Sequence, residues 1–185
     1  MPGGSVDALV RRQSERIART TANALKALPD SWVVLHDLRW PGRPFASIDH
    51  VAVGPGGVFV IGSIRWSGRI QLAGNVLRHN GRRREREVLS VREAAAAVSR
   101  RLGHVPRTWM TPVLCIVGSD VDGWAGSVAV CHKTNLVQSL TSRPEVLAPE
   151  VVRSLVDDLR LQLRASVPTA PSRRSSRVRP RFRLR

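Results

Sequence analysis

Apolar positions recur at helical spacing in several parts of the chain. The spacing predicts helices over residues 6–28, 88–102 and 149–163, and a shorter one near residues 136–140. Pro29-Asp30 ends the first helix and Gly103 ends the second. The face of the first helix that lies away from its apolar positions carries Arg11, Arg12, Arg16 and Arg19.

Shorter apolar runs, rich in β-branched residues, are typical of strands. The expected strands cover residues 32–38, 47–53, 58–64, 68–72, 75–79, 111–117 and 128–130. Gly54-Pro55-Gly56-Gly57 predicts a hairpin between the second and third strands. Residues 111–117 are almost continuously apolar, which is typical of a strand buried on both faces. Residues 120–126 read as a loop.

Length and composition favour one folded domain with a tail. The chain has 185 residues, of which 42% are hydrophobic, so it can bury a sizeable core. We expect a flexible segment over residues 1–5, a domain over 6–165 and a disordered tail over 166–185, where arginine, proline and serine predominate.

The sequence also excludes or disfavours several classes of protein. No apolar run approaches the length of a membrane-spanning helix, and the N-terminus lacks the pattern of a signal peptide, so a cytoplasmic protein is expected. Cys115 and Cys131 lie in apolar runs and are expected to be reduced core residues. The five histidines are scattered and there is no CxxC pair, so the sequence contains no recognisable zinc site.

The charge balance is strongly basic. Thirty Lys plus Arg residues face 14 acids, giving a formal net charge of +16. This excess points to polyanions, to an anionic surface, or to a genome that favours arginine codons, since only Lys26 and Lys133 are lysines. The charge is shared between the folded part and the tail, which contains no acid.

Residues 47–61, with the sequence SIDHVAVGPGGVFVI, resemble the hallmark of the nuclease-related domain (NERD) family, whose members resemble PD-(D/E)xK nucleases. Further matches are Ser14-Glu15, Trp66-Ser67-Gly68 and Pro112-Val113-Leu114-Cys115. The resemblance spans residues 6–163. Together with the element order, it implies an α/β fold with a restriction-endonuclease-like core, made of a helix, a three-stranded meander, a second helix and a further strand, and followed by a C-terminal helix.

The resemblance implies metal-assisted hydrolysis of phosphodiesters. In such a core, an Asp on the second strand and an acid two residues before a Lys on the third strand hold one or two Mg²⁺ ions. Residues two apart on a strand face the same side, so the acid and the Lys enter one site. Asp49 stands at the position of the first metal ligand.

The third strand departs from the family pattern. Gly62 occupies the position of the acid and Ile64 that of the Lys. Arg65 is one residue away and points to the opposite face unless a bulge intervenes. We therefore expect a degenerate nuclease that needs no cofactor, with Mg²⁺ bound weakly at Asp49 only if some activity remains. Glu15 is either a remnant of the site or an exposed acid that pairs with Arg11 or Arg19.

One alternative retains activity. Enzymes of this kind can carry the acid on a neighbouring helix, and Glu93 is the candidate for that migration, although no relocated Lys accompanies it. The competing interpretation of Glu93 is a solvated acid near a helix N-terminus. His50 is adjacent to Asp49 but faces the other side of its strand, where we expect a hydrogen-bonded structural histidine.

Candidate nucleic-acid contacts are Trp66, Arg82, Arg83 and Arg84, although the favoured interpretation is a packed tryptophan and a solvated basic face. In the tail the candidates are Arg173, Arg174, Arg177, Arg179, Arg181, Arg183 and Arg185. A flexible arm of this kind neutralises phosphates without reading sequence. The favoured partner is nucleic acid, bound non-specifically, and an anionic membrane or an acidic protein remains the alternative for a non-enzymatic interaction domain.

Overall fold

The fold is built on a mixed sheet of six strands in the order β1-β2-β3-β7-β9-β8. The computed structural model describes residues 3–43, 46–103 and 105–163. The strands are β1 (Val33–Arg39), β2 (Ser47–Gly54), β3 (Gly57–Arg65), β7 (Met110–Val117), β8 (Gly123–Ala125) and β9 (Val128–His132). β1, β2 and β3 form an antiparallel meander, and β7 and β9 continue the sheet in parallel with β3.

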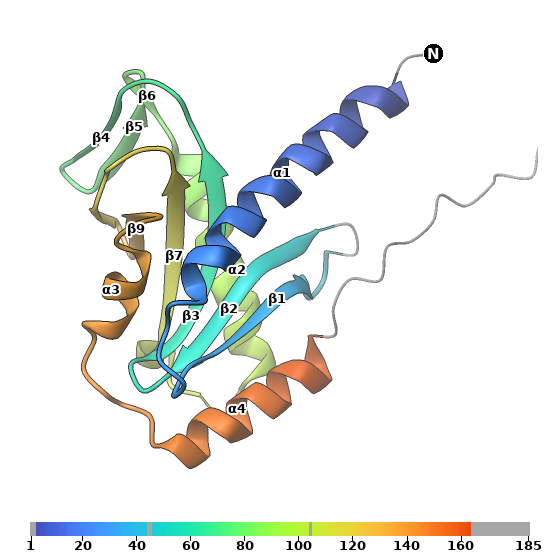
Figure 1. Ribbon diagram of the computed structural model, residues 1–185, viewed down its shortest axis with the longest axis vertical. Coiled ribbons are helices and arrows are strands. Elements are labelled where there is room, and N and C mark those ends of the chain that lie inside the picture. The colour runs from blue at the N-terminus through green and yellow to red at the C-terminus, as the bar shows by residue number, and fades with distance from the viewer. Residues whose placement is uncertain (1–2, 44–45, 104, 164–185) are drawn as a thin grey trace, which may run out of the picture.

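A smaller antiparallel sheet extends from the end of β3. It contains β4 (Ile70–Ala73), β5 (Val76–His79) and β6 (Arg82–Arg83). The chain then enters α2, so this small sheet lies at the start of that helix (Figure 1). The sequence predicted the first two of these strands, whereas β6 has only two residues and depends on its pairing with β5.

Helices cover both faces of the large sheet. They are α1 (Gly3–Leu25), α2 (Glu85–Arg101), α3 (Leu136–Thr141) and α4 (Pro149–Gln162), together with a short 3-10 turn at Arg107–Trp109. In the view of Figure 1, α1 crosses the near face of the sheet and α2 lies behind it. The α/β class predicted from the sequence is confirmed.

Alternation along β3 sends its side chains into two different cores. Val58 and Val60 pack with residues of α2 and α4 on one face. Phe59 and Ile61 pack with Leu25 of α1 and with α3 on the other. β3 is therefore buried on both faces, and the expectation that the run 111–117, now β7, is also buried on both faces is confirmed.

The N-terminal part of α1 continues beyond the edge of the sheet (Figure 1). Leu9 and Val10 fit the helical spacing but are 62% and 60% exposed, because no element lies beneath them. The buried side chains of this helix are Thr21 and Leu25, near its C-terminal end. α1 therefore has a packed half and a solvated half.

Some boundaries differ from the sequence-based expectation for local physical reasons. α1 ends at Leu25, not at residue 28, because Ala27 and Leu28 donate to the carbonyls three residues before them and so form a tighter turn. The expected loop over residues 120–126 contains β8, which is stabilised by pairing with β9. α2 begins at Glu85, three residues early.

The two cysteines lie in the core as predicted. Cys115 and Cys131 face each other across β7 and β9 and both are free and buried. Among the described residues, no helix is both long enough and apolar enough to cross a membrane. The tail over residues 166–185 lies outside the described residues.

Candidate functional site

Asp49 lies where β2 and β3 separate. Backbone pairing between these strands runs from Gly54↔Gly57 to His50↔Ile61 and stops there. Beyond that point, the Asp49 carboxylate accepts the backbone N–H of Ser63 at 2.7 Å. The side chain thus continues the connection between the two strands after the backbone hydrogen bonds end.

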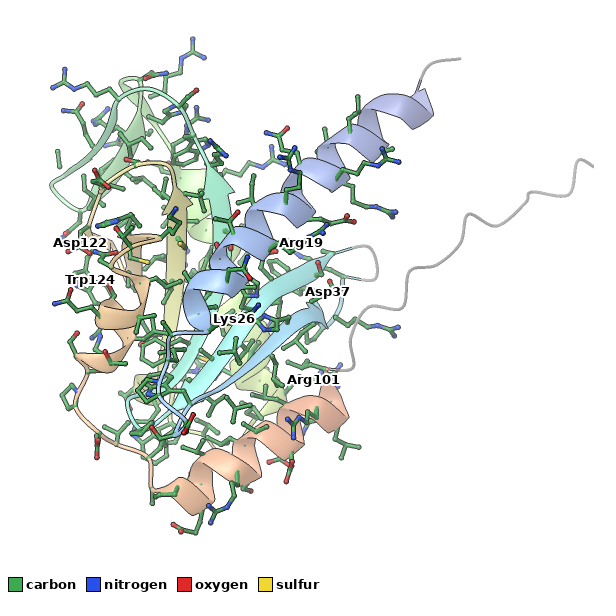
Figure 2. The ribbon with its side chains drawn as sticks, in the orientation of Figure 1. Arg19, Lys26, Asp37, Arg101, Asp122 and Trp124 are labelled. Atoms are coloured by element: carbon green, nitrogen blue, oxygen red, sulfur yellow. The ribbon has the colours of Figure 1, made fainter. Side chains whose placement is uncertain are left out.

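An irregularity in β1 faces this point. Asp37 lies between the pairs His36↔His50 and Leu38↔Ile48 and adopts a left-handed φ of 48°. Asp and Asn tolerate this conformation better than other non-glycine residues. Asp37, labelled on β1 in Figure 2, is itself exposed.

Burial makes Asp49 a weak acid. The pKa of its carboxyl is raised from 3.8 to about 6, chiefly by desolvation. Its hydrogen bond with the backbone N–H of Ser63 acts in the opposite direction, and the negative charge of Asp37 adds to the increase in pKa. Near pH 7 the group is therefore still mostly ionised, and it becomes largely protonated only below about pH 6.

A cavity of about 400 Å³ lies between Asp49 and α2. Its polar lining comes from both the sheet and the helix: Ser47, Asp49, Ser63, Arg86, Glu87 and Ser90. Glu87 is a site residue that the sequence pattern does not predict, because the apolar spacing starts the helix at residue 88. The available signal was its spacing, since Glu87, Val91 and Ala94 are three to four residues apart and share one helix face.

The position of the family acid is closed by α2. A Cβ atom on Gly62 would lie 2.8 Å from Cγ2 of Val91, which is shorter than real contacts of this kind. Ile64, at the position of the Lys, packs against the cluster that contains Val91 and Leu114. Apolar packing therefore replaces both charged groups.

Arg65 does not compensate for the missing cation. The register between β3 and β7 is uninterrupted from Val58↔Met110 to Arg65↔Val117, so no bulge shifts the alternation. The expectation that Arg65 faces away from Ile64 is confirmed.

These residues do not fit a Mg²⁺ site. Mg²⁺ needs several oxygen ligands, and the Asp49 carboxylate already accepts a backbone N–H. Glu87, the other carboxylate that lines the cavity, forms an ion pair with Arg84 at 3.5 Å. Within the described ranges, no group of three His, Cys, Asp or Glu side chains is arranged to hold a metal.

The other two candidate acids lie outside this cavity. Glu93 binds Arg43 through an ion pair of 2.6 Å and is not among the residues that line the cavity. Glu15 lies on the exposed half of α1 and pairs with Arg11 at 3.6 Å. The structure thus brings neither of them into the lining that contains Asp49.

His50 is a buried structural residue, as the sequence predicted. Its Nε2 lies 3.1 Å from the carbonyl of Ala18 and its Nδ1 lies 2.8 Å from Nδ1 of His36. A carbonyl only accepts, so we assign the proton of His50 to Nε2, which leaves its Nδ1 to accept from His36. This chain of contacts connects α1 with β1 and β2.

The pKa of His50 is lowered from 6.5 to about 4. Burial is the main cause and the neighbouring His36 adds to it, while the bond with Ala18 opposes the shift. Burial, and then the charge of Lys26, also lower the pKa of His36. Both rings are therefore neutral near pH 7.

Trp66 is held in a stack. The ring of His79 lies parallel to it at 5.0 Å, and the guanidinium of Arg84 lies 5.2 Å from its centre. Arg82 and Arg83 are exposed on β6, where Arg83 pairs with Glu85 at 3.0 Å. The basic cluster thus divides into a packed Arg84 and two solvated arginines. The candidate arginines of the tail lie outside the described residues.

Comparison with known protein families finds one match, to the nuclease-related domain (NERD), over residues 12–117. The matched region runs from α1 to the end of β7 and includes Asp49, Gly62 and Ile64. No curated protein and no solved structure gives a significant match.

The hydrogen bond of Asp49 predicts a difference in stability between two substitutions at this position. Asp49→Asn keeps an acceptor for Ser63, whereas Asp49→Ala leaves that part-buried N–H without its side-chain acceptor. We expect the Asn variant to be more stable than the Ala variant by about 1–3 kcal/mol, measured by urea unfolding at pH 8. Both variants remove the buried charge, so the comparison isolates the hydrogen bond. Equal stability would contradict the structural role of Asp49.

The contact between Gly62 and Val91 predicts that substitutions at these two positions have coupled effects on stability. Gly62→Ala forces the new methyl group against Val91 and should cost about 1–3 kcal/mol of stability. Val91→Ala makes room for it, so the double variant should lose less than the sum of the two single losses, by about 0.5–3 kcal/mol. Additive losses in denaturant unfolding would show that Val91 does not fill this space.

The opposite pKa shifts of Asp49 and His50 predict two pH-dependent contributions to stability that oppose each other. Between pH 4 and 6.5 the unfolded state binds more protons at His50 than the folded state, so this group adds stability as pH rises. Between pH 3.8 and 6 the folded state binds more protons at Asp49, so that group removes stability as pH rises. The two contributions largely cancel in the wild-type protein.

Asp49→Asn should therefore expose the His50 contribution. Between pH 4.5 and 6 the unfolding free energy of this variant should rise more steeply than that of the wild type, by about 1 kcal/mol per pH unit. Parallel pH profiles of the two proteins in urea unfolding would rule out the raised pKa of Asp49.

Proposed function

The chain belongs to the nuclease-related domain (NERD) family, and from that premise we propose that it is a catalytically inactive member that binds nucleic acid without cutting it. The observation that carries the proposal is the packing of Val91 against Gly62. It places an apolar side chain where a nuclease of this kind needs its second carboxylate.

Three features of the site support the loss of catalysis. Asp49 is the one acid of the family pattern that remains, and its carboxylate already accepts the backbone N–H of Ser63. Gly62 and Ile64 provide neither the second carboxylate nor the cation. Restoring an acid at position 62 would also require the Val91 side chain to give way, because its Cγ2 lies 2.8 Å from the place of the new Cβ.

Charge supports binding of a polyanion. The net charge of +16 is large for a chain of this length, and the family fold is one that in active relatives faces a phosphodiester backbone. Binding of this kind neutralises phosphates and releases counterions, so it depends on salt and carries little sequence preference. The reduced, buried Cys115 and Cys131 are in keeping with the cytoplasmic location expected from the sequence.

Two alternatives make different predictions. An active enzyme would need a displaced acid, for which Glu93 is the sequence candidate, but its ion pair with Arg43 would first have to open. A non-enzymatic interaction domain would bind an anionic membrane or an acidic protein in place of nucleic acid.

The proposal is tested by measuring cleavage and binding on the same full-length protein. With Mg²⁺ or Mn²⁺, supercoiled plasmid and labelled single-stranded DNA should remain uncut, at the level of Asp49→Ala and of a metal-free control. Labelled duplex and single-stranded DNA should bind in fluorescence anisotropy, with an affinity that falls steeply between 50 and 200 mM salt, by a factor of roughly 10³ if about six phosphates are contacted.

Each contrary result has a distinct meaning. Metal-dependent cleavage that Asp49→Ala abolishes would refute catalytic loss, and its further loss in Glu93→Gln would identify the displaced acid. Absence of DNA and RNA binding at low salt would refute the binding role and favour a membrane or protein partner.

A further inference from the structure

α1 carries a line of polar and basic side chains on its solvent side. We call the following residues the α1 stripe: Arg12, Arg16, Arg19, Asn23 and Lys26. Their spacing of three or four residues places them on one face of the helix and of the turn that directly follows it. All are exposed. Figure 2 labels Arg19 on α1 and Lys26 in the turn that follows the helix.

The orientation of this face is fixed by contacts on the other side of α1. Thr21 and Leu25 are buried against the sheet, and the carbonyl of Ala18 is held by His50. Residues two apart on a helix differ by about 200° in direction, so Arg19 lies opposite Thr21. The packed half of α1 thus directs the α1 stripe into solvent.

Negative charge is sparse along α1 itself. Glu15 is the only acid between residues 8 and 26, and it pairs with Arg11, which is outside the stripe. Of the ion pairs between described residues, this is the one that involves α1. The cations of the stripe are therefore available to a ligand.

We propose that the α1 stripe is the surface that holds the phosphate backbone of nucleic acid, an inference that rests on the function proposed above. Fourteen residues separate Arg12 from Lys26, which is about 21 Å of helix. Along a duplex axis, that length corresponds to the rise of about six base pairs, which leaves room for the four cations of the stripe each to lie near a phosphate. The solvated half of α1 extends the same face beyond the sheet.

The composition of this face favours a phosphate backbone over a lipid surface. An interfacial helix needs bulky apolar residues beside its basic ones, to insert below the headgroups. The α1 stripe contains none, and the exposed Leu9 and Val10 lie N-terminal to it without an aromatic neighbour. Arginine and asparagine donors suit phosphate oxygens directly.

The test compares two full-length variants with the same loss of charge. In the stripe variant Arg12, Arg16, Arg19 and Lys26 are replaced by Gln, and in the control variant Arg101, Arg107, Arg153 and Arg160 are replaced by Gln. All eight side chains are exposed, and glutamine keeps the helical propensity of arginine. The measurement is the anisotropy of a labelled 20-base-pair duplex over a range of salt concentrations.

In the stripe variant the slope of log K against log salt should fall by about 0.9 for each phosphate contact removed, up to about 3.6. The control variant should keep nearly the wild-type slope. Equal changes in both variants would overturn the α1 stripe as the contact surface while leaving the proposed function intact. If the wild type itself does not bind, the proposed function fails instead.

A single substitution that is expected to tighten DNA binding serves as a control for misfolding. Glu15→Gln removes the acid beside the α1 stripe and should tighten DNA binding several-fold at 50 mM salt, which a damaged protein would not do. Unchanged or weaker binding would contradict the proposal. The last measurement uses vesicles that contain phosphatidylserine. If the stripe variant loses binding to these vesicles while its DNA binding is unchanged, the surface belongs to a membrane contact.

Discussion

The burial of β3 between two helical layers determines both the fold and the packing at the candidate site. Val58 and Val60 pack toward α2, and Phe59 and Ile61 pack toward α1 and α3. The same alternation continues at Gly62, so the residue there also faces α2. Because a hydrophobic layer already lies above this strand, loss of the carboxylate lets Val91 close the space with apolar contact.

Asp49 and His50 are adjacent on β2, and their pKa values are shifted in opposite directions. Desolvation disfavours charge at both residues, which makes the acid weaker and the base weaker. Each group is then held by hydrogen bonds, to Ser63 on one side of the strand and to Ala18 and His36 on the other. Asp49 thus has a structural task that does not depend on metal binding.

Much of this architecture was predictable because it follows from periodicity. The strands that form the meander, the double burial of β7, the structural role of His50 and the direction of Arg65 all depend on alternation within regular strands. Features that depend on tertiary contact were not predictable. Glu87 reaches the cavity because α2 begins earlier than its apolar spacing indicates, and β8 exists because β9 pairs with it. Likewise, Leu9 and Val10 have the spacing of a core face but extend past the sheet that would have covered them.

The left-handed Asp37 has a consequence for assembly. β1 forms one border of the large sheet, where unpaired N–H and C=O groups are a template on which another chain can add a strand. A residue with φ of 48° in the middle of that border breaks the regular row of donors and acceptors. An added strand would have to desolvate the exposed carboxylate at the same position, which is costly. At the β1 border, one residue thus opposes edge-to-edge pairing in two ways.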